Sequence, residues 1–176
     1  MRKSTRRLVF LALLVAMGTA LHLVEGMLLI PSPLPGVKLG LANIITLLTL
    51  YLYGFRDGLT VAIMRVVLGS LLGGMFLSPG FLLGLSGAIC SALIMAALLK
   101  RTSCFSMIGI SLAGAAGHNL GQLLAAGLLL QSTAIVFYLP VLLLAGIPTG
   151  LITGFLLNAL LAHDARSGIL RDFTQQ

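Results

Sequence analysis

Long apolar runs, separated by short turns, extend along almost the whole chain. The breaks contain residues typical of turns and helix ends, as in Pro31-Ser-Pro-Leu-Pro-Gly36 and Ser78-Pro-Gly80. A helix that crosses the hydrocarbon core of a membrane needs about 20 predominantly apolar residues. The pattern therefore predicts an all-α integral membrane protein, a single domain over 1–176 with six transmembrane helices at about 8–30, 39–53, 58–77, 81–99, 105–130 and 134–162.

The composition changes the set of plausible functions. Hydrophobic residues make up 59% of the 176 residues and charged residues only 9%, whereas soluble domains contain about 25% charged residues. So few charges cannot cover the surface of a soluble domain, which argues against a water-soluble enzyme. The net charge of +7 does not indicate nucleic-acid binding, because the basic residues lie in short clusters between the apolar runs.

Lysine and arginine are distributed unevenly between the two ends of the expected helices. Lys38 lies in a loop on one side. The other side carries Arg2, Lys3, Arg6, Arg7, Arg56, Lys100, Arg101, Arg166 and Arg171. Positively charged loops remain on the cytoplasmic side of a membrane. We therefore expect both termini in the cytoplasm and a multi-pass location in the cell membrane.

Small residues recur at four-residue spacing, which places them on one face of a helix and lets another helix approach closely. The glycine rows, which we expect to pack helices inside the bundle, are Gly69 and Gly73, Gly117 and Gly121, and Gly146, Gly150 and Gly154. The first helix carries Ala12, Ala16 and Ala20. This alanine stripe could face either the bundle or a partner protein.

Several polar side chains fall within the expected spans, where they are costly. Arg65 lies roughly 12 Å into the third span, near the bilayer centre, where an arginine costs about 2.5–3.5 kcal/mol on insertion scales. The expected topology brings it together with other polar groups in the outer half of the bundle. These candidate substrate-binding residues are Glu25, Lys38, Asn43, Arg65, His118, Asn119 and Gln122.

Two interpretations of this polar cluster are open. A group of polar side chains within apolar walls is typical of a small-molecule binding site. Alternatively, the same residues form interhelical hydrogen bonds and one buried ion pair between Arg65 and Glu25. His22 shares a helix face with Glu25, at i and i+3, and we interpret it as a packing residue.

Sequence signals for catalysis are absent. The chain has no Walker A motif, so we expect no ATP hydrolysis by the chain itself. Its four acidic residues are isolated from one another, and its histidines lack metal-ligand spacing. We therefore expect no enzyme activity, no metal and no cofactor.

One stretch of the sequence carries a family resemblance. Pro35-Gly-Val-Lys-Leu-Gly-Leu-Ala-Asn43, followed by Gly54-Phe-Arg-Asp-Gly58, resembles the first two helices of the substrate-binding (S) components of energy-coupling factor transporters. It is similar above all to the Gx transporter family, often labelled heptaprenyl diphosphate synthase component I. Arg65-Val-Val-Leu-Gly-Ser-Leu-Leu-Gly-Gly74 extends the resemblance into the third helix.

The resemblance implies a six-helix S-component bundle with a binding pocket on the extracellular side. It also implies that Ala12, Ala16 and Ala20 dock on a membrane coupling subunit, which works with two cytoplasmic ATPases. The synthase label fits the residues poorly, because polyprenyl diphosphate synthases have aspartate-rich motifs that this chain lacks.

Two functions follow as hypotheses. In the first, the chain is the membrane-embedded substrate-binding subunit for uptake of a small molecule, with Arg65 and Lys38 favouring a ligand that has an anionic group. In the second, it is a non-catalytic membrane subunit associated with isoprenoid, quinone or redox machinery.

Overall fold

The chain folds as a bundle of α-helices. The structure is a computed structural model, and it describes residues 2–27, 41–101 and 104–167. Its elements are α1 (Arg2–Met27), α2 (Leu41–Tyr53), α3 (Phe55–Leu72), α4 (Pro79–Leu99), α5 (Met107–Leu130), the 3-10 helix η1 (Thr133–Tyr138) and α6 (Leu139–Ser167). No strand occurs in these ranges, and the predicted all-α fold is confirmed.

Three apolar segments are long enough to cross a membrane. They are Thr5–Glu25 in α1, Pro79–Leu99 in α4 and Ala134–Ala165, which covers η1 and most of α6. The apolar helix α2 is shorter, because its 13 residues extend over only about 20 Å. Within the described ranges, length and composition therefore support a membrane protein.

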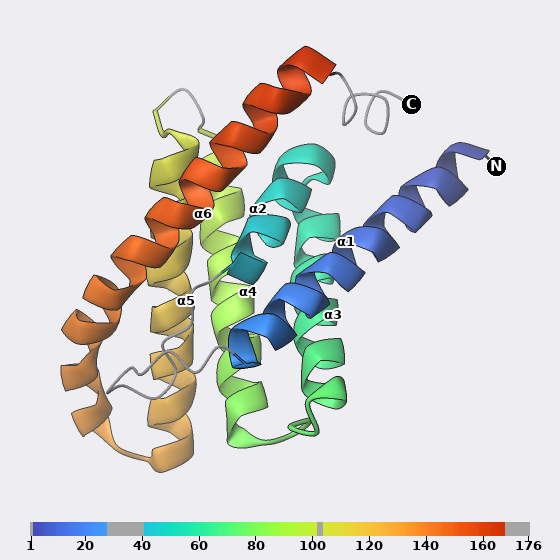
Figure 1. Cartoon of the computed structure of the whole chain (residues 1–176). Helices are drawn as coiled ribbons and strands as arrows, with labels where there is room; N and C mark the ends of the chain where they lie inside the picture. The colour runs from blue at the N-terminus through green and yellow to red at the C-terminus, as the bar shows by residue number, and fades with distance from the viewer. Residues whose placement is uncertain (1, 28–40, 102–103, 168–176) are drawn as a thin grey trace.

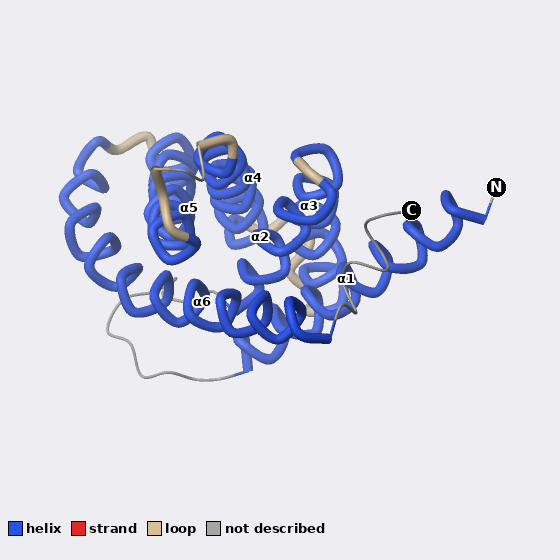
Figure 2. Tube along the Cα trace, turned by 90° about the horizontal axis from the view of Figure 1, so that it is seen from above, coloured by secondary structure: helices blue, strands red, loops and turns tan. Residues whose placement is uncertain are grey.

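The short helix α2 occupies the centre of the bundle. Figure 2 shows α5, α4 and α3 in one row, with α6 and α1 crossing on the opposite side and α2 between the two layers. In agreement with this view, α2 contacts each of the other five α-helices. Its core side chains Leu47, Leu48 and Leu50 are at most 5% exposed. A helix that is apolar on every side is stable only when it is surrounded in this way.

The observed helix ends differ from those expected at several places. The third helix begins at Phe55 and ends at Leu72, instead of covering 58–77. Gly54 alone makes the turn after α2, with a φ of 83° that favours glycine. The expected helix at 134–162 is divided into η1 and α6, which begins at Leu139. α1 begins before the expected residue 8, because its basic N-terminal residues are already helical.

Serine residues form the N-caps of two of the long helices. The Oγ of Ser78 accepts the backbone N–H of Phe81 at 3.2 Å, and Pro79 occupies the first turn of α4. At the start of α5, Ser106 accepts the backbone N–H of Gly109 in the same way. Each serine satisfies a backbone donor that has no partner within the helix.

The glycine rows lie mainly where helices approach closely. Between α5 and α6, a Cβ atom at Gly150 or Gly154 would lie 2.9 or 2.7 Å from a backbone Cα atom of α5. Between α4 and α5, Gly117 and Gly121 face side chains and backbone oxygens of α4. Gly73 is an exception, because it is exposed and marks the end of α3.

The alanine stripe of α1 faces outward. Ala12, Ala16 and Ala20 are all exposed. The opposite face of the helix carries Leu14, which is 3% exposed, and the buried Gly18. Of the two orientations left open by the sequence, the described structure therefore has the stripe pointing away from the bundle.

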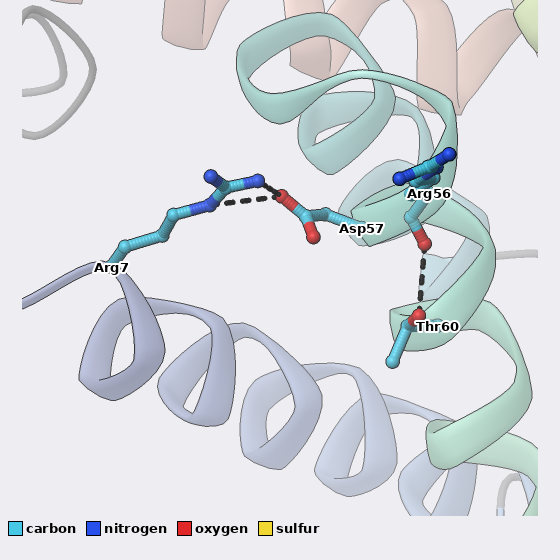
Figure 3. A network of polar contacts seen from close by, with 4 residues as sticks. All are labelled: Arg7, Arg56, Asp57 and Thr60. Atoms are coloured by element: carbon cyan, nitrogen blue, oxygen red, sulfur yellow. Dashed lines mark hydrogen bonds and ion pairs between the residues drawn. The ribbon is translucent and has the colours of Figure 1, made fainter. Parts of the chain in front are cut away.

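A polar contact ties the N-terminal half of α1 to the first turn of α3. The guanidinium of Arg7 donates two hydrogen bonds to Oδ2 of Asp57, one from Nε at 3.1 Å and one from Nη2 (Figure 3). It also lies 5.7 Å from the centre of the Tyr53 ring, which packs against Phe10. Figure 1 shows that α1 otherwise extends away from the bundle toward its N-terminus.

The close contact between α5 and α6 yields a stability prediction. We expect Gly154→Ala to lower the unfolding temperature in detergent, because the new methyl group would lie 2.7 Å from the Cα of Ile108. Inserting an extra methyl group into a well-packed interface costs about 1–3 kcal/mol. Gly127→Ala is the control, because the nearest atom to its new methyl group would be the backbone oxygen of Ser132, 3.8 Å away. Equal unfolding temperatures for the two variants would contradict the packing argument.

Candidate functional site

A small cavity of about 40 Å³ lies where the helices converge. Every one of the six α-helices contributes to its wall. The lining residues are His22, Glu25, Ala42, Asn43, Arg65, Val66, Gly84, Ala115, His118, Asn119, Gln122 and Thr149. Seven of these twelve side chains carry charged, imidazole or amide groups, so a polar site lies inside an otherwise apolar bundle.

The structure brings together six of the seven residues singled out in the sequence. They are Glu25, Asn43, Arg65, His118, Asn119 and Gln122, and they come from α1, α2, α3 and α5. The seventh, Lys38, lies outside the described residues. The loop containing Pro31 and Gly36 lies outside them as well.

Arg65 is the most deeply buried charged group of this site. Its side chain is 3% exposed, and its Nη2 donates a 2.7 Å hydrogen bond to Oδ1 of Asn43. Its stem passes Gly18 of α1, where a Cβ atom would lie 3.4 Å from the Arg65 Cδ. The hydrogen bond thus joins α3 to α2, a contact that the sequence did not predict.

One donor of the Arg65 side chain is left without a partner. Its Nε is buried and makes no hydrogen bond to any described residue. An unsatisfied buried donor costs about 1–3 kcal/mol or more when it is charged. Arg65 also lines the cavity.

Glu25 supplies a negative charge to the same cavity. It is 7% exposed and comes from the C-terminal part of α1. Its carboxylate acts electrostatically on the Arg65 guanidinium. Two buried charges of opposite sign reduce each other's cost of leaving water, provided that hydrogen bonds satisfy them as well.

The polar residues of α5 are positioned by contacts with α4 and α6. Asn119 donates from Nδ2 to the backbone oxygen of Leu142 at 2.6 Å, close to Gly146 of α6. On the other side, a Cβ atom at Gly87 would lie 2.9 Å from both His118 and Gln122. A glycine on each neighbouring helix therefore makes room for the amide and imidazole groups.

Two polar residues that line the cavity, His22 and Thr149, were not predicted from the sequence to do so. His22, interpreted there as a packing residue, does pack against Gly69, but it also lines the cavity. Its position three residues before Glu25, on the same helix face, could have indicated that it lines the cavity. Thr149 gave no comparable signal, because a threonine within an apolar helix is most often a local hydrogen-bonding residue. Its Oγ1 indeed donates to the backbone oxygen of Gly146.

The lining offers charged and neutral hydrogen-bonding groups within a small space. It combines one guanidinium, one carboxylate, two imidazoles and amide groups. Across the described ranges, no three His, Cys, Asp or Glu residues gather as metal ligands would. Such a set can hold a polar solute by hydrogen bonds and charge.

The comparison with known families confirms the family named in the sequence resemblance, but it does not show the similarity to S components. A family model described as heptaprenyl diphosphate synthase component I matches residues 14–160. The match includes every lining residue of the cavity. No curated protein and no solved structure matches the chain.

The contact between Asn43 and Arg65 can be tested by its effect on stability. We expect Asn43→Ala to destabilise the protein by about 1.5–3 kcal/mol, the usual contribution of a hydrogen bond to a charged group. The exposed Asn158 provides the control, and Asn158→Ala should leave the unfolding temperature unchanged. If both variants unfold at the wild-type temperature, Asn43 does not stabilise the buried guanidinium.

Proposed function

The chain belongs to the family described as heptaprenyl diphosphate synthase component I, and from this premise we propose that it is a membrane-embedded substrate-binding subunit for uptake of a small molecule. The observation that carries the proposal is the cavity, where polar side chains of several helices surround a small enclosed space. An apolar bundle that only held other proteins together would not need both Arg65 and Glu25 at one point in its interior.

We further propose that all six helices cross the cell membrane, with both termini in the cytoplasm. The asymmetry of lysine and arginine along the sequence supports this orientation. It places the end of α1 and the start of α2 on the outer side. Glu25 and Asn43 lie close to those two helix ends, so the cavity would be reached from outside the cell.

In this proposal, separate proteins supply the energy. The expected partners are a membrane coupling subunit and two cytoplasmic ATPases, as in transporters with S components. The exposed stripe of Ala12, Ala16 and Ala20 supports a docking role for α1, because small residues let a partner helix approach closely. The neighbouring Leu13 and Met17 are exposed too, at 54% and 48%, and would add apolar contact.

The second candidate is a non-catalytic subunit of isoprenoid, quinone or redox machinery. The description of the matched family favours it. The dimensions of the cavity favour uptake of a small solute instead, because about 40 Å³ has room for only a few water-sized groups. We also propose that the chain is not itself an enzyme, since Glu25 is the one carboxylate among the lining residues.

Purification in mild detergent, followed by mass spectrometry of bound small molecules, tests the binding role. We expect the wild-type protein to retain a small polar molecule and Arg65→Ala to lose it. The matched control is Arg56→Ala, which removes an exposed arginine from the same helix. A folded Arg65→Ala protein that retains the ligand would exclude Arg65 from the site.

The docking role of α1 has a separate test. We expect Ala16→Trp to prevent co-purification of the coupling subunit and ATPases while the unfolding temperature stays the same, because Ala16 is exposed. Ala159→Trp, at an exposed position on α6, should leave co-purification intact. Recovery of a prenyl synthase or redox subunits from the wild type, without any ATPase, would favour the second candidate.

A further inference from the structure

The two formal charges that line the cavity have opposite signs. Arg65 contributes one positive charge and Glu25 one negative charge, so with neutral histidines the described lining has a net charge of zero. Both side chains are more than nine-tenths buried. A ligand that enters this space therefore meets a fixed positive pole and a fixed negative pole, with little water to screen either of them.

The Arg65 guanidinium is held in place by one hydrogen bond and keeps one N–H donor without a partner. Asn43 takes the hydrogen bond from Nη2 of Arg65 and holds the planar group in place. The buried Nε has no acceptor among the described residues. A carboxylate is the acceptor that suits a guanidinium best, because its oxygens match the planar arrangement of the N–H donors.

The negative pole selects against a ligand that carries only a carboxylate. A simple anion bound to Arg65 would lie in the same small cavity as Glu25 and would be repelled by it. A cationic group on the same ligand changes the sign of that interaction. It would be attracted by Glu25 while the ligand carboxylate pairs with Arg65.

The volume limits the distance between the two ligand groups. The cavity of about 40 Å³ corresponds to a few water-sized groups, since one water needs about 10–15 Å³. A small ligand, whose two charged groups are separated by only a few bonds, suits this space best. Imidazole and amide groups of the wall can accept or donate the remaining hydrogen bonds.

We propose that the cavity binds a small zwitterionic amino acid, with its carboxylate on Arg65 and its ammonium group toward Glu25. This assignment rests on the proposed substrate-binding function and narrows it to one class of ligand. It also differs from the expectation of an anionic ligand, which depended on Lys38, a residue outside the described part of the chain.

Binding to the purified full-length protein in detergent tests the assignment. The probes are glycine and L-alanine, in which one carbon separates the two charged groups, and β-alanine and 4-aminobutanoate, in which the separation increases. Propanoate and ethylamine are the matched analogues of alanine that lack the amino or the carboxyl group. We expect at least one amino acid to raise the unfolding temperature and to give a calorimetric binding signal, and neither analogue to do so at the same concentration.

Substitutions of Arg65 and Glu25 then test which side chain binds which group of the ligand. We expect Arg65→Gln and Glu25→Gln each to weaken amino acid binding by about tenfold or more, as loss of a charge-assisted hydrogen bond implies. Arg56→Gln removes an exposed arginine of the same helix and should leave binding unchanged. If Arg65→Gln does not fold, Glu25→Gln and the two analogues still decide the outcome.

Two results would overturn the assignment. If propanoate binds as tightly as alanine and Glu25→Gln has no effect, the cavity is an anion site, and the proposed substrate-binding function survives. If none of the four amino acids binds to the folded wild-type protein, the zwitterion assignment is wrong. The ligand retained from native membranes then decides separately whether the substrate-binding function stands.

Discussion

The buried guanidinium of Arg65 is the constraint around which the rest of the bundle is organised. A charged group in an apolar bundle needs partners, and Arg65 obtains them from two of the helices packed beside α3. α2 supplies the oxygen of Asn43, α1 supplies the charge of Glu25, and Gly18 gives the arginine stem room to pass. This requirement explains why a helix as short as α2 is placed at the centre, where it can bring Asn43 to the guanidinium.

At three helix contacts, a glycine on one helix lies opposite a large polar side chain on the neighbouring helix. Gly69 faces His22, Gly87 faces His118 and Gln122, and Gly146 faces Asn119. A methyl group at any of these glycines would lie within 3 Å of the facing side chain. The glycines thus let neighbouring helices approach each other without excluding the polar groups from the interface.

The sequence predicted the helical class and six of the polar residues that line the cavity, because both predictions depend on the cost of polar groups in apolar runs. Arg65 and Glu25 stand out for that reason alone. It did not predict that Asn43 accepts the hydrogen bond of Arg65, or that His22 faces the cavity. These facts depend on how each helix is rotated against its neighbours, and that rotation is set by contacts such as His22 on Gly69. The start of α3 was missed because a single glycine, Gly54, makes a turn for which several residues were expected.

The two faces of α1 provide a physical link between a partner and the cavity. One face carries Gly18, His22 and Glu25 toward the site, and the other carries the exposed alanine stripe. Near its N-terminus, Arg7 ties the helix to Asp57 on α3, the helix that also carries Arg65. A partner that tilts or rotates α1 must therefore move Glu25 relative to Arg65 or break the contact with Asp57. Under the proposed function, a movement of α1 that changes the separation of Glu25 and Arg65 would couple docking on the outer face to ligand affinity inside the bundle.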